Sequence, residues 1–411
     1  MRPEFHFTAA SGWINDPHGI THRDGKYDAF FQYVPDRTDW APNCHWGHAH
    51  GVDLLSLHEL PVAIAPGEGD GGIWTGSLVT GSDGGTRIFY TSTSEPDIGI
   101  GRIRVATPDD DEWILWTKGS FVVDAPTDLD LIAYRDPFLR EDPDGWRMFV
   151  GAGGVDGTAM ALSYRSDDLE AWEYEGVALS RSTAETTDVW MGALWECPQI
   201  FDINGRAVMV SSVWDNDVLH YAGYAVGTYT HGKFTATRWG RLTYGDSYYA
   251  PSLFHDAEGR ACLSFWMRGI GDESAGWASA HSVPYLLTLE GDTLIAVPHP
   301  DLDKYRTGTP TRDIAGLAAD ITWTPDESGL TIESAGVTVV ALVRKNDELT
   351  AAAGDKTWTL PFSSDVRIIL DGPVLEIASA GGLFAAPITP QGAGLTMRGS
   401  NSEIAGHALN R

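Results

Sequence analysis

Basic residues and long apolar runs are both scarce in this sequence of 411 residues. It has 28 Lys and Arg against 57 Asp and Glu, which gives a formal net charge of −29. A strongly acidic surface repels phosphate backbones and anionic headgroups, so nucleic acid and membrane surfaces are disfavoured as partners. No run of about 18 apolar residues is present to span a membrane.

Cysteine is also rare. Cys44, Cys197 and Cys262 are far apart and odd in number. They form neither a disulfide framework nor a zinc-binding spacing, and they fit a reducing compartment. The first residues contain no apolar segment typical of a signal peptide. We therefore expect a cytoplasmic protein, or a secreted one if a signal peptide has been removed.

Helical periodicity is nearly absent as well. In its place are short runs rich in Val, Ile, Tyr, Phe and Trp, each preceded by a turn that contains Asp-Gly or Asn-Gly. Aromatic and β-branched runs that follow such turns are typical of β-hairpins, so we predict an all-β protein. Clear examples are the runs at 27–33, 87–92, 146–151 and 207–212.

These units repeat along the chain. Each has an anchor segment, then a turn, then an aromatic strand, and the anchors centre on residues 16, 76, 136, 196 and 249. The spacings between successive anchors are 60, 60, 60 and 53 residues, which leaves room for about four short strands in each unit. A nearly constant period of this kind predicts propeller blades. The anchors are Asn15-Asp16-Pro17, Trp74-Thr75-Gly76-Ser77, Arg135-Asp136-Pro137, Trp195-Glu196-Cys197-Pro198 and Tyr248-Tyr249-Ala250-Pro251.

The pattern changes near residue 300. Five units predict a five-bladed β-propeller over residues 1–300. Residues 307–411 have few aromatics and carry aliphatic β-branched runs such as 337–342 and 366–371. This second part is predicted to be a C-terminal β-sandwich domain with few candidate catalytic groups.

Three anchors carry an acid, namely Asp16, Asp136 and Glu196. In isolation the stretch around Asp16 is more typical of a turn. Its recurrence predicts that three carboxylates meet at one end of the propeller axis, among some of the 16 tryptophans. Clustered acids serve either to bind Ca²⁺ or Mg²⁺ or to hydrolyse glycosides, and flat aromatic walls favour sugars.

The immediate neighbours suggest different roles for these acids. The charge of Arg135 is expected to hold Asp136 ionised. Glu196 lies between Trp195 and Cys197, an apolar setting that is expected to raise its pKa toward that of a general acid. Asp16 is expected to stay ionised.

The motif Trp13-Ile14-Asn15-Asp16-Pro17-His18-Gly19 resembles the sucrose-binding signature of glycoside hydrolase family 32, the invertases, levanases and inulinases. Further segments are similar to the family pattern in the same order, and the resemblance covers the whole chain. They are Phe31-Gln32-Tyr33-Val34-Pro35, Cys44-His45-Trp46-Gly47-His48-Ala49, Trp74-Thr75-Gly76-Ser77, Phe89-Tyr90-Thr91-Ser92, Tyr134-Arg135-Asp136-Pro137, Trp195-Glu196-Cys197-Pro198, Gly245-Asp246-Ser247-Tyr248-Tyr249-Ala250-Pro251 and, in the C-terminal part, Val366-Arg367-Ile368-Ile369-Leu370-Asp371 with Val374-Leu375-Glu376-Ile377.

The resemblance implies a retaining β-fructofuranosidase that acts on sucrose, fructo-oligosaccharides or fructans, without a cofactor or metal. Asp16 would be the nucleophile, Glu196 the acid/base, and Asp136 would bind fructose hydroxyls and stabilise the transition state. Seven further residues would line the fructose subsite: Asn15, Gln32, Trp40, Trp74, Thr75, Arg135 and Trp266. For Trp40 and Trp266, packing in the core is an equal alternative.

Some positions depart from the family pattern. His18 replaces an Asn, Gln199 replaces an Asp, and Trp74-Thr75 replaces Phe-Ser. These departures leave the identity of the substrate open more than the reaction. His45, His48 and His50 are close in sequence, but we assign them structural roles, because no complete set of metal ligands lies near them apart from Cys44.

Three alternatives stay open: a fructosyltransferase, a related five-bladed glycosidase acting on arabinose, and a sugar-binding propeller without catalysis. Linkage preference, chain length and oligomeric state are not determined by the sequence.

Overall fold

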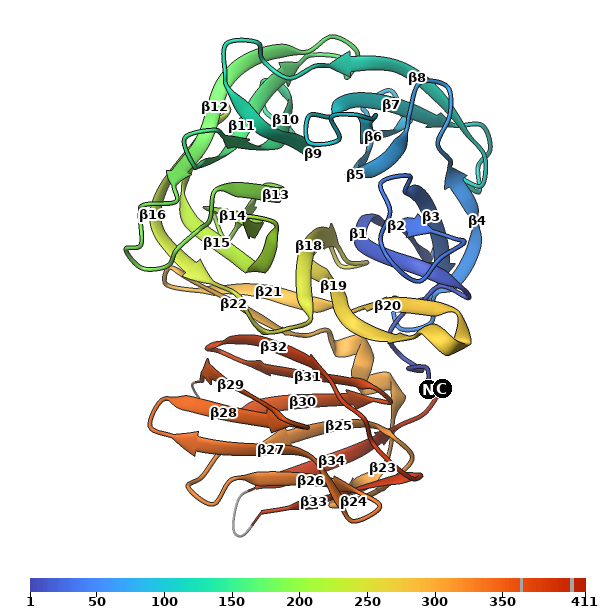
Figure 1. The fold of residues 1–411 in the computed structure, drawn as a ribbon, viewed down its shortest axis with the longest axis vertical. Coiled ribbons are helices and arrows are strands. Elements are labelled where there is room, and N and C mark those ends of the chain that lie inside the picture. Colours follow the sequence, from blue (N-terminus) through green and yellow to red (C-terminus); the bar gives the residue numbers. More distant parts are fainter. Residues whose placement is uncertain (363–364, 400–402) are drawn as a thin grey trace.

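The computed structural model describes residues 1–362, 365–399 and 403–411. Its strands form a ring of five blades with a two-sheet sandwich packed against one side of the ring (Figure 1). This arrangement confirms the predicted fold class, an all-β five-bladed propeller followed by a β-sandwich. Both chain ends lie where the ring meets the sandwich (Figure 1).

The blades follow one another along the chain, and the anchor of each blade lies near the start of its first, innermost strand. Blade one contains β1 (Gly12–Arg23), β2 (Lys26–Val34), β3 (His45–Gly51) and β4 (His58–Ile64); blade two β5 (Gly72–Thr80), β6 (Thr86–Thr93), β7 (Arg102–Pro108) and β8 (Trp116–Val123); blade three β9 (Leu131–Asp142), β10 (Gly145–Gly154), β11 (Thr158–Ser166) and β12 (Glu173–Ser182); blade four β13 (Leu194–Ile203), β14 (Arg206–Asp215), β15 (Val218–Thr230) and β16 (Lys233–Arg241); and blade five β18 (Tyr248–His255), β19 (Ala261–Asp272), β20 (Trp277–His281), β21 (Tyr285–Glu290) and β22 (Thr293–Pro298).

The predicted turn chemistry is present at the hairpins. Asp24 and Gly25 join β1 to β2 with φ angles of 50° and 76°, and Asn204 and Gly205 join β13 to β14 with 51° and 76°. Two successive residues at positive φ match the twist of the flanking strands, and Asn, Asp and Gly tolerate this conformation best. The predicted strands at 27–33, 87–92, 146–151 and 207–212 lie in β2, β6, β10 and β14.

The ring closes between the fifth and first blades. Strand β20 pairs antiparallel with β19 and parallel with β1, where Gly12 and Trp13 lie opposite Trp277 and Ala278. The first anchor, near the N-terminus, is therefore held by the last blade. Since a closed ring has no open edge there, the position of Asp16 depends on both ends of the propeller.

Each inner strand begins at the same end of the axis, so the loops that precede an inner strand or join the second strand of a blade to the third lie at that end. We call eight of them the mouth loops: 35–44, 94–101, 124–130, 155–157, 183–193, 216–217, 246–247 and 273–276.

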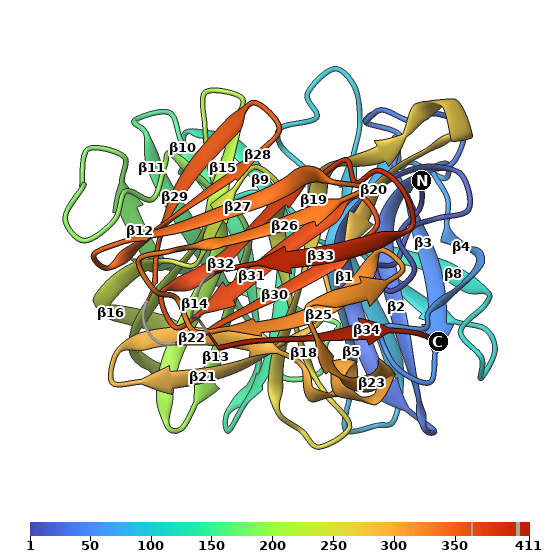
Figure 2. The same ribbon diagram turned by 90° about the horizontal axis from the view of Figure 1, so that it is seen from below.

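The sandwich has two sheets around an aliphatic core, seen in front of the propeller in Figure 2. One sheet contains β23 (Arg306–Thr311), β25 (Ala318–Trp323), β30 (Val366–Asp371), β31 (Val374–Ser379), β32 (Gly382–Pro387) and β34 (Ile404–Leu409), and the other β24 (Asp313–Ala315), β26 (Leu330–Ser334), β27 (Val337–Lys345), β28 (Glu348–Ala353), β29 (Lys356–Pro361) and β33 (Gly394–Arg398). The first sheet takes an extra strand from the propeller region, because β17 (Thr243–Gly245) pairs with β32.

Helix is limited, within the described residues, to two short 3₁₀ segments, η1 (Glu273–Ala275) and η2 (Pro300–Tyr305). No helix of the described chain has the length and apolar character needed to cross a membrane. Segment η2 follows the last propeller strand and precedes the first sandwich strand. We propose residues 1–300 and 307–411 as the two domains, with β17 bridging them.

A buried polar cluster joins the N-terminal segment, the fifth blade and the sandwich. His6 contacts Asp371 through Nδ1 (2.8 Å) and Glu376 through Nε2 (2.9 Å), and all three side chains are buried. Tyr248 in β18 donates to Glu376 at 2.8 Å. Burial opposes the charge on His6, but the two carboxylates outweigh it and raise the pKa of His6 to about 10. The cluster therefore ties the sandwich to the strand that carries the fifth anchor.

We expect His6→Gln to lower the free energy of unfolding by about 3–5 kcal/mol at pH 6, because two buried carboxylates lose their cation. His6 has a folded-state pKa of about 10 and an ordinary value of 6.5. Its contribution is therefore complete below pH 6.5 and is lost as the pH rises through 10. Urea unfolding of both proteins at pH 6 and pH 9.5 should show this difference shrinking. His58→Gln, at an exposed position, is the control. An equal difference at both pH values would contradict the charged state of His6.

Candidate active site

All five inner strands are irregular at their anchors. The pairing register shifts between Ile14 and Pro17 in β1, and between Trp74 and Gly76 in β5. Equivalent shifts occur at the anchors of the other three inner strands, β9, β13 and β18. A β-bulge of this kind bends a strand and redirects its side chains, and bulges are frequent beside active sites. The repeated bulge is the local feature that directs the anchor side chains toward the axis.

Three of these bulges contain a residue in the left-handed region directly before a proline. They are Asp136, Cys197 and Ala250, with φ angles of 65°, 50° and 46°. Such a φ is strained for a residue with a side chain, so the surrounding structure must hold it in place. The proline in each anchor is therefore part of the bulge.

Hydrogen-bond donors surround the Asp16 carboxyl group. Thr75 donates to Oδ2 at 2.6 Å and Asn15 donates to Oδ1 at 3.0 Å. Gln32 donates to Oδ2 at 3.3 Å and also to the Thr75 hydroxyl at 2.5 Å. His281 fixes the backbone here, because its Nε2 lies 2.8 Å from the Asn15 carbonyl oxygen. Three of the residues predicted to line the site, Asn15, Gln32 and Thr75, thus converge on Asp16.

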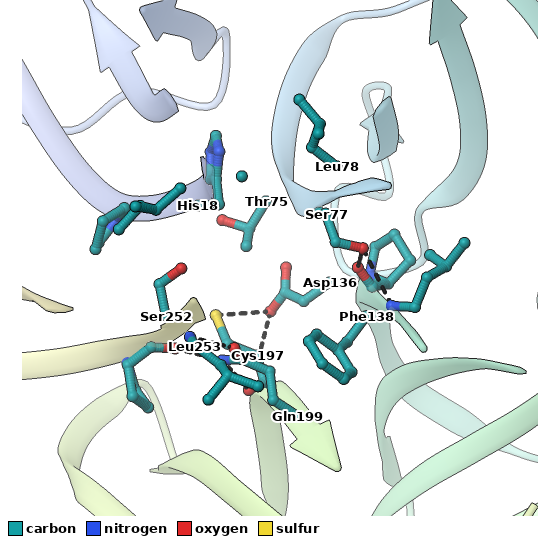
Figure 3. A pocket seen from close by; sticks show the side chains of 17 residues that line it. His18, Thr75, Ser77, Leu78, Asp136, Phe138, Cys197, Gln199, Ser252 and Leu253 are labelled. Atoms are coloured by element: carbon teal, nitrogen blue, oxygen red, sulfur yellow. Dashed lines mark hydrogen bonds between the residues drawn. The ribbon is translucent and has the colours of Figure 1, made fainter. Parts of the chain in front are cut away.

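Asp136 lies close to Asp16. The Cys197 sulfur is 3.7 Å from Oδ2 of Asp16 and also 3.7 Å from Oδ2 of Asp136. The Cys197 backbone N–H donates to Asp136 Oδ2 at 2.9 Å (Figure 3). The Asp136 N–H donates to Thr91 at 2.8 Å. The first, third and fourth anchors therefore meet around one thiol.

Glu196 is held at both carboxyl oxygens. Arg135 donates to Oε1 through Nη2 (2.8 Å) and Nε (3.1 Å), while Tyr249 donates to Oε2 at 2.5 Å. The close approach of blades three and four permits the Arg135 contact. Gly151 lies between them, where any side chain would overlap the Trp195 carbonyl oxygen. The predicted apolar setting of Glu196 is wrong, because a guanidinium and a phenol face its carboxyl group.

The prediction that Arg135 keeps Asp136 ionised is also wrong. Burial raises the pKa of Asp136 to about 8 against the opposing charge of Arg135, and Glu196 and Asp16 raise it further. Burial also raises the pKa of Asp16, and the hydrogen bonds from Thr75 and Asn15 oppose that effect. At pH 7 the Asp136 carboxyl group is therefore mostly protonated, which relieves repulsion among three buried acids.

Aromatic rings form one wall beside the acids. Trp13 meets Trp266 edge to face at 5.6 Å, and Trp266 meets Tyr249 at 6.2 Å. The Trp266 indole donates to Ser279 at 3.0 Å, so the ring is fixed. Trp266, predicted as a subsite residue, therefore lies against the Glu196 side of the site.

Trp40 and Trp74 form a second wall. Trp74 is buried, and its indole donates to the Pro42 carbonyl oxygen at 2.8 Å. Trp40, in a mouth loop, meets it edge to face at 5.7 Å and is 42% exposed. Trp40 is therefore a rim residue, and its contact with a sugar stays a prediction.

His18 is part of the packing around the site and contacts none of the three acids in the structure. Its ring stacks on Trp46 at 3.9 Å, and the Trp46 indole donates to the Trp74 carbonyl oxygen at 2.9 Å. Burial lowers the pKa of His18 well below its usual value, so the ring is neutral. A cavity lies beside it on the axis, lined partly by Thr75, Asp136 and Cys197 (Figure 3).

Gln199 links the fourth and fifth blades. Its amide nitrogen donates to the carbonyl oxygens of Cys197 (3.2 Å) and Pro251, and its amide oxygen accepts from the Leu253 N–H at 2.6 Å. It thereby joins the bulge after Glu196 to the bulge after Tyr249. A shorter Asp would have to span the same gap without an N–H donor.

Within the described residues, one group has ligand atoms close enough together to hold a metal: Asp256, Cys262 and His299. Arg260 donates to Asp256 at 2.6 Å and already supplies a positive charge. His48, one of the three histidines close in sequence, contacts Asp28 at 3.1 Å and stacks on Phe30.

Sequence reasoning missed roles for Tyr249, Cys197 and Thr91. The repeat contained a signal for Tyr249, since it precedes Ala250-Pro251 as Glu196 precedes Cys197-Pro198. Thr91 lies outside every anchor, in the family-like segment Phe89-Tyr90-Thr91-Ser92, and no role in the site was predicted for it.

The propeller brings three acids together at one end of its axis, as a glycosidase that uses paired carboxyl groups needs. Comparison with known proteins identifies the family. Residues 6–298 match the model of the glycosyl hydrolases family 32 N-terminal domain. The chain therefore belongs to glycosyl hydrolase family 32.

Curated relatives include a sucrose-6-phosphate hydrolase of Zymomonas mobilis, 29% identical over 77% of this chain and 65% of that protein. A Bacillus subtilis levanase is 30% identical over 74% of this chain and 48% of the levanase. The chain thus spans less than two thirds of the length of these relatives.

Solved structures share the fold over the whole chain. A Bombyx mori GH32 beta-fructofuranosidase has a TM-score of 0.87 at 23% identity, covering 100% of this chain and 94% of that one. Fructan 1-exohydrolase IIa from Cichorium intybus has a TM-score of 0.82 at 21% identity, covering 99% and 97%.

We expect Gln199→Leu to lower the free energy of unfolding by about 2–3 kcal/mol, because the Leu253 N–H and the Pro251 carbonyl lose a buried partner. Urea unfolding measures this change. Gln391→Leu, at an exposed position, is the matched control. Equal stability of the Gln199 variant and wild type would contradict the bridging role.

Proposed function

We propose that the protein is a retaining β-fructofuranosidase that hydrolyses terminal β-fructofuranosyl bonds in sucrose, fructo-oligosaccharides or fructans. The observation that carries the proposal is the convergence of Asp16, Asp136 and Glu196 at one end of the axis, in a chain of this family. The Bombyx mori relative has been solved as a variant in complex with sucrose, and the Cichorium intybus enzyme, also as a variant, with 1-kestose.

In the proposed first step, Asp16 attacks the anomeric carbon of the fructosyl unit. The bond to the leaving oxygen breaks, and Glu196 gives that oxygen its proton. Four hydrogen-bonding partners hold the two reacting carboxyl groups in position: Thr75 and Asn15 on Asp16, and Arg135 and Tyr249 on Glu196. Fixed geometry of this kind lowers the entropic barrier to reaction.

In the second step, a water molecule attacks the same carbon. Glu196 takes a proton from the water as the bond to Asp16 breaks, which releases fructose with its original configuration. Asp136 contributes by binding fructose hydroxyls. With a pKa near 8 in the free protein, it can donate as well as accept a hydrogen bond.

A fructosyltransferase is the second candidate, in which a sugar hydroxyl takes the place of water in this last step. The appearance of longer oligomers from concentrated sucrose would favour it.

We expect wild type to release fructose from at least one of sucrose, inulin and levan, and Asp16→Asn to lose at least about 10³-fold in kcat. The amide has nearly the same shape as the carboxyl group but cannot attack. Release of reducing sugar, with circular dichroism to confirm folding, measures the effect. Equal, slow turnover by the two proteins on all three substrates would contradict the enzyme proposal.

Retention of configuration tests the double displacement separately. We expect β-fructofuranose to be the first product seen by NMR during rapid hydrolysis, before mutarotation. This outcome corresponds to a separation of about 5–5.5 Å between the Asp16 and Glu196 carboxyl groups. An α-product would mean that water, not Asp16, attacks first.

A further inference from the structure

Acidic residues far outnumber basic residues in the mouth loops. Together they contain thirteen Asp or Glu and a single basic residue, Arg37, with no Lys or His. Acids of several loops point into solvent, among them Asp36, Glu95 and Asp188. A ligand approaching the three central acids therefore passes through a strongly negative field.

The basic side chains near the mouth loops already form ion pairs or hydrogen bonds. Arg37 donates to Asp39 at 2.7 Å, and Lys356 of the sandwich binds Asp246 at 2.8 Å. Arg268 donates to the Leu219 carbonyl oxygen at 2.6 Å.

Inside the site, Arg135 is held by Glu196. His220 packs against Trp190 at 4.8 Å, and burial lowers its pKa, so it stays neutral near pH 7. A bound phosphate group would have to replace one of these ion-pair or hydrogen-bond partners to gain a cation.

Rings at the mouth suit uncharged sugars. Trp40 is 42% exposed in loop 35–44. Trp190, in loop 183–193, is partly exposed and donates to Thr183 at 3.0 Å. Tyr221 donates to the Trp190 carbonyl oxygen, which fixes the segment further. Fixed rings offer apolar faces to the C–H groups of a sugar, but these faces provide no positive charge to stabilise an anion.

We propose that the site accepts β-fructosides whose leaving group is uncharged and rejects those whose leaving sugar carries a phosphate ester. The inference rests on the proposed β-fructofuranosidase function and narrows its substrate class. It separates this chain from the sucrose-6-phosphate hydrolases among its relatives. The physical cause is that a phosphate dianion would lose water and meet carboxylates, while Arg37, Arg135, Arg268 and Lys356 already have hydrogen-bond or ion-pair partners.

The test compares kcat/KM for sucrose and sucrose-6-phosphate. At low ionic strength we expect the value for the phosphorylated sugar to be at least about tenfold lower. The ratio should narrow in about 0.5 M NaCl, where the screening length is only a few ångströms.

Charge-neutralising variants locate the effect. Asp36→Asn, Glu95→Gln and Asp188→Asn together should raise kcat/KM for sucrose-6-phosphate by about three- to tenfold and leave that for sucrose unchanged. The matched control makes the same change in charge at exposed positions at the opposite end of the blades: Asp24→Asn, Asp111→Asn and Glu141→Gln. An equal effect of both triple variants would overturn the assignment to the mouth loops.

The remaining outcomes separate the inference from the proposed function. Equal or faster turnover of sucrose-6-phosphate by wild type would overturn the inference and leave the function standing. Turnover of neither sugar, nor of any fructan, would overturn the function. In that case calorimetry with the same two sugars decides the inference. Weaker binding of the phosphorylated sugar would support it, and equal or tighter binding would refute it.

Discussion

Three carboxyl groups share a small buried space at one end of the propeller axis, and much of the surrounding structure offsets their repulsion. Burial and mutual repulsion disfavour three negative charges in one place. Protonation of Asp136 removes one charge near neutral pH, Arg135 donates hydrogen bonds to Glu196, and Thr75, Asn15 and Gln32 donate to Asp16. The same contacts restrict the side chains to fixed positions, as the proposed double displacement requires.

The fold produces this arrangement by repeating one local irregularity. A bulge at the same place in each inner strand turns the anchor side chains toward the axis. Contacts between blades then hold the bulges in place. Gln199 joins the fourth and fifth blades, His281 binds the backbone of the first anchor, and Gly151 lets the third and fourth blades approach. Beyond the ring, Tyr248 connects the fifth anchor to Glu376 of the sandwich. The sandwich thus supports the strand that supplies Tyr249 to Glu196.

Charged groups affect the site both through direct contacts and through a longer-range field. Close to the reacting groups, each anion has a specific hydrogen-bond donor or cation. At the mouth, acids outnumber bases and the nearby cations are engaged, so the field is negative over a longer range. Such a field has little effect on a neutral sugar and opposes a phosphorylated one. Under the proposed specificity, part of the net negative charge would therefore act in substrate choice.

The sequence alone determined the all-β class, the five repeats, the sandwich and the three acids, because hydrophobic alternation, turn residues and a constant period are local properties. It was wrong about Arg135 and about the surroundings of Glu196. Arg135 and Asp136 are neighbours in the chain, yet the Arg135 guanidinium donates to Glu196, and burial outweighs its charge at Asp136. Only the tertiary structure decided that Arg135 reaches across to Glu196 while burial protonates Asp136. The partner of a charged group and its exclusion from water depend on how closely separate blades approach, and no local pattern encodes that distance.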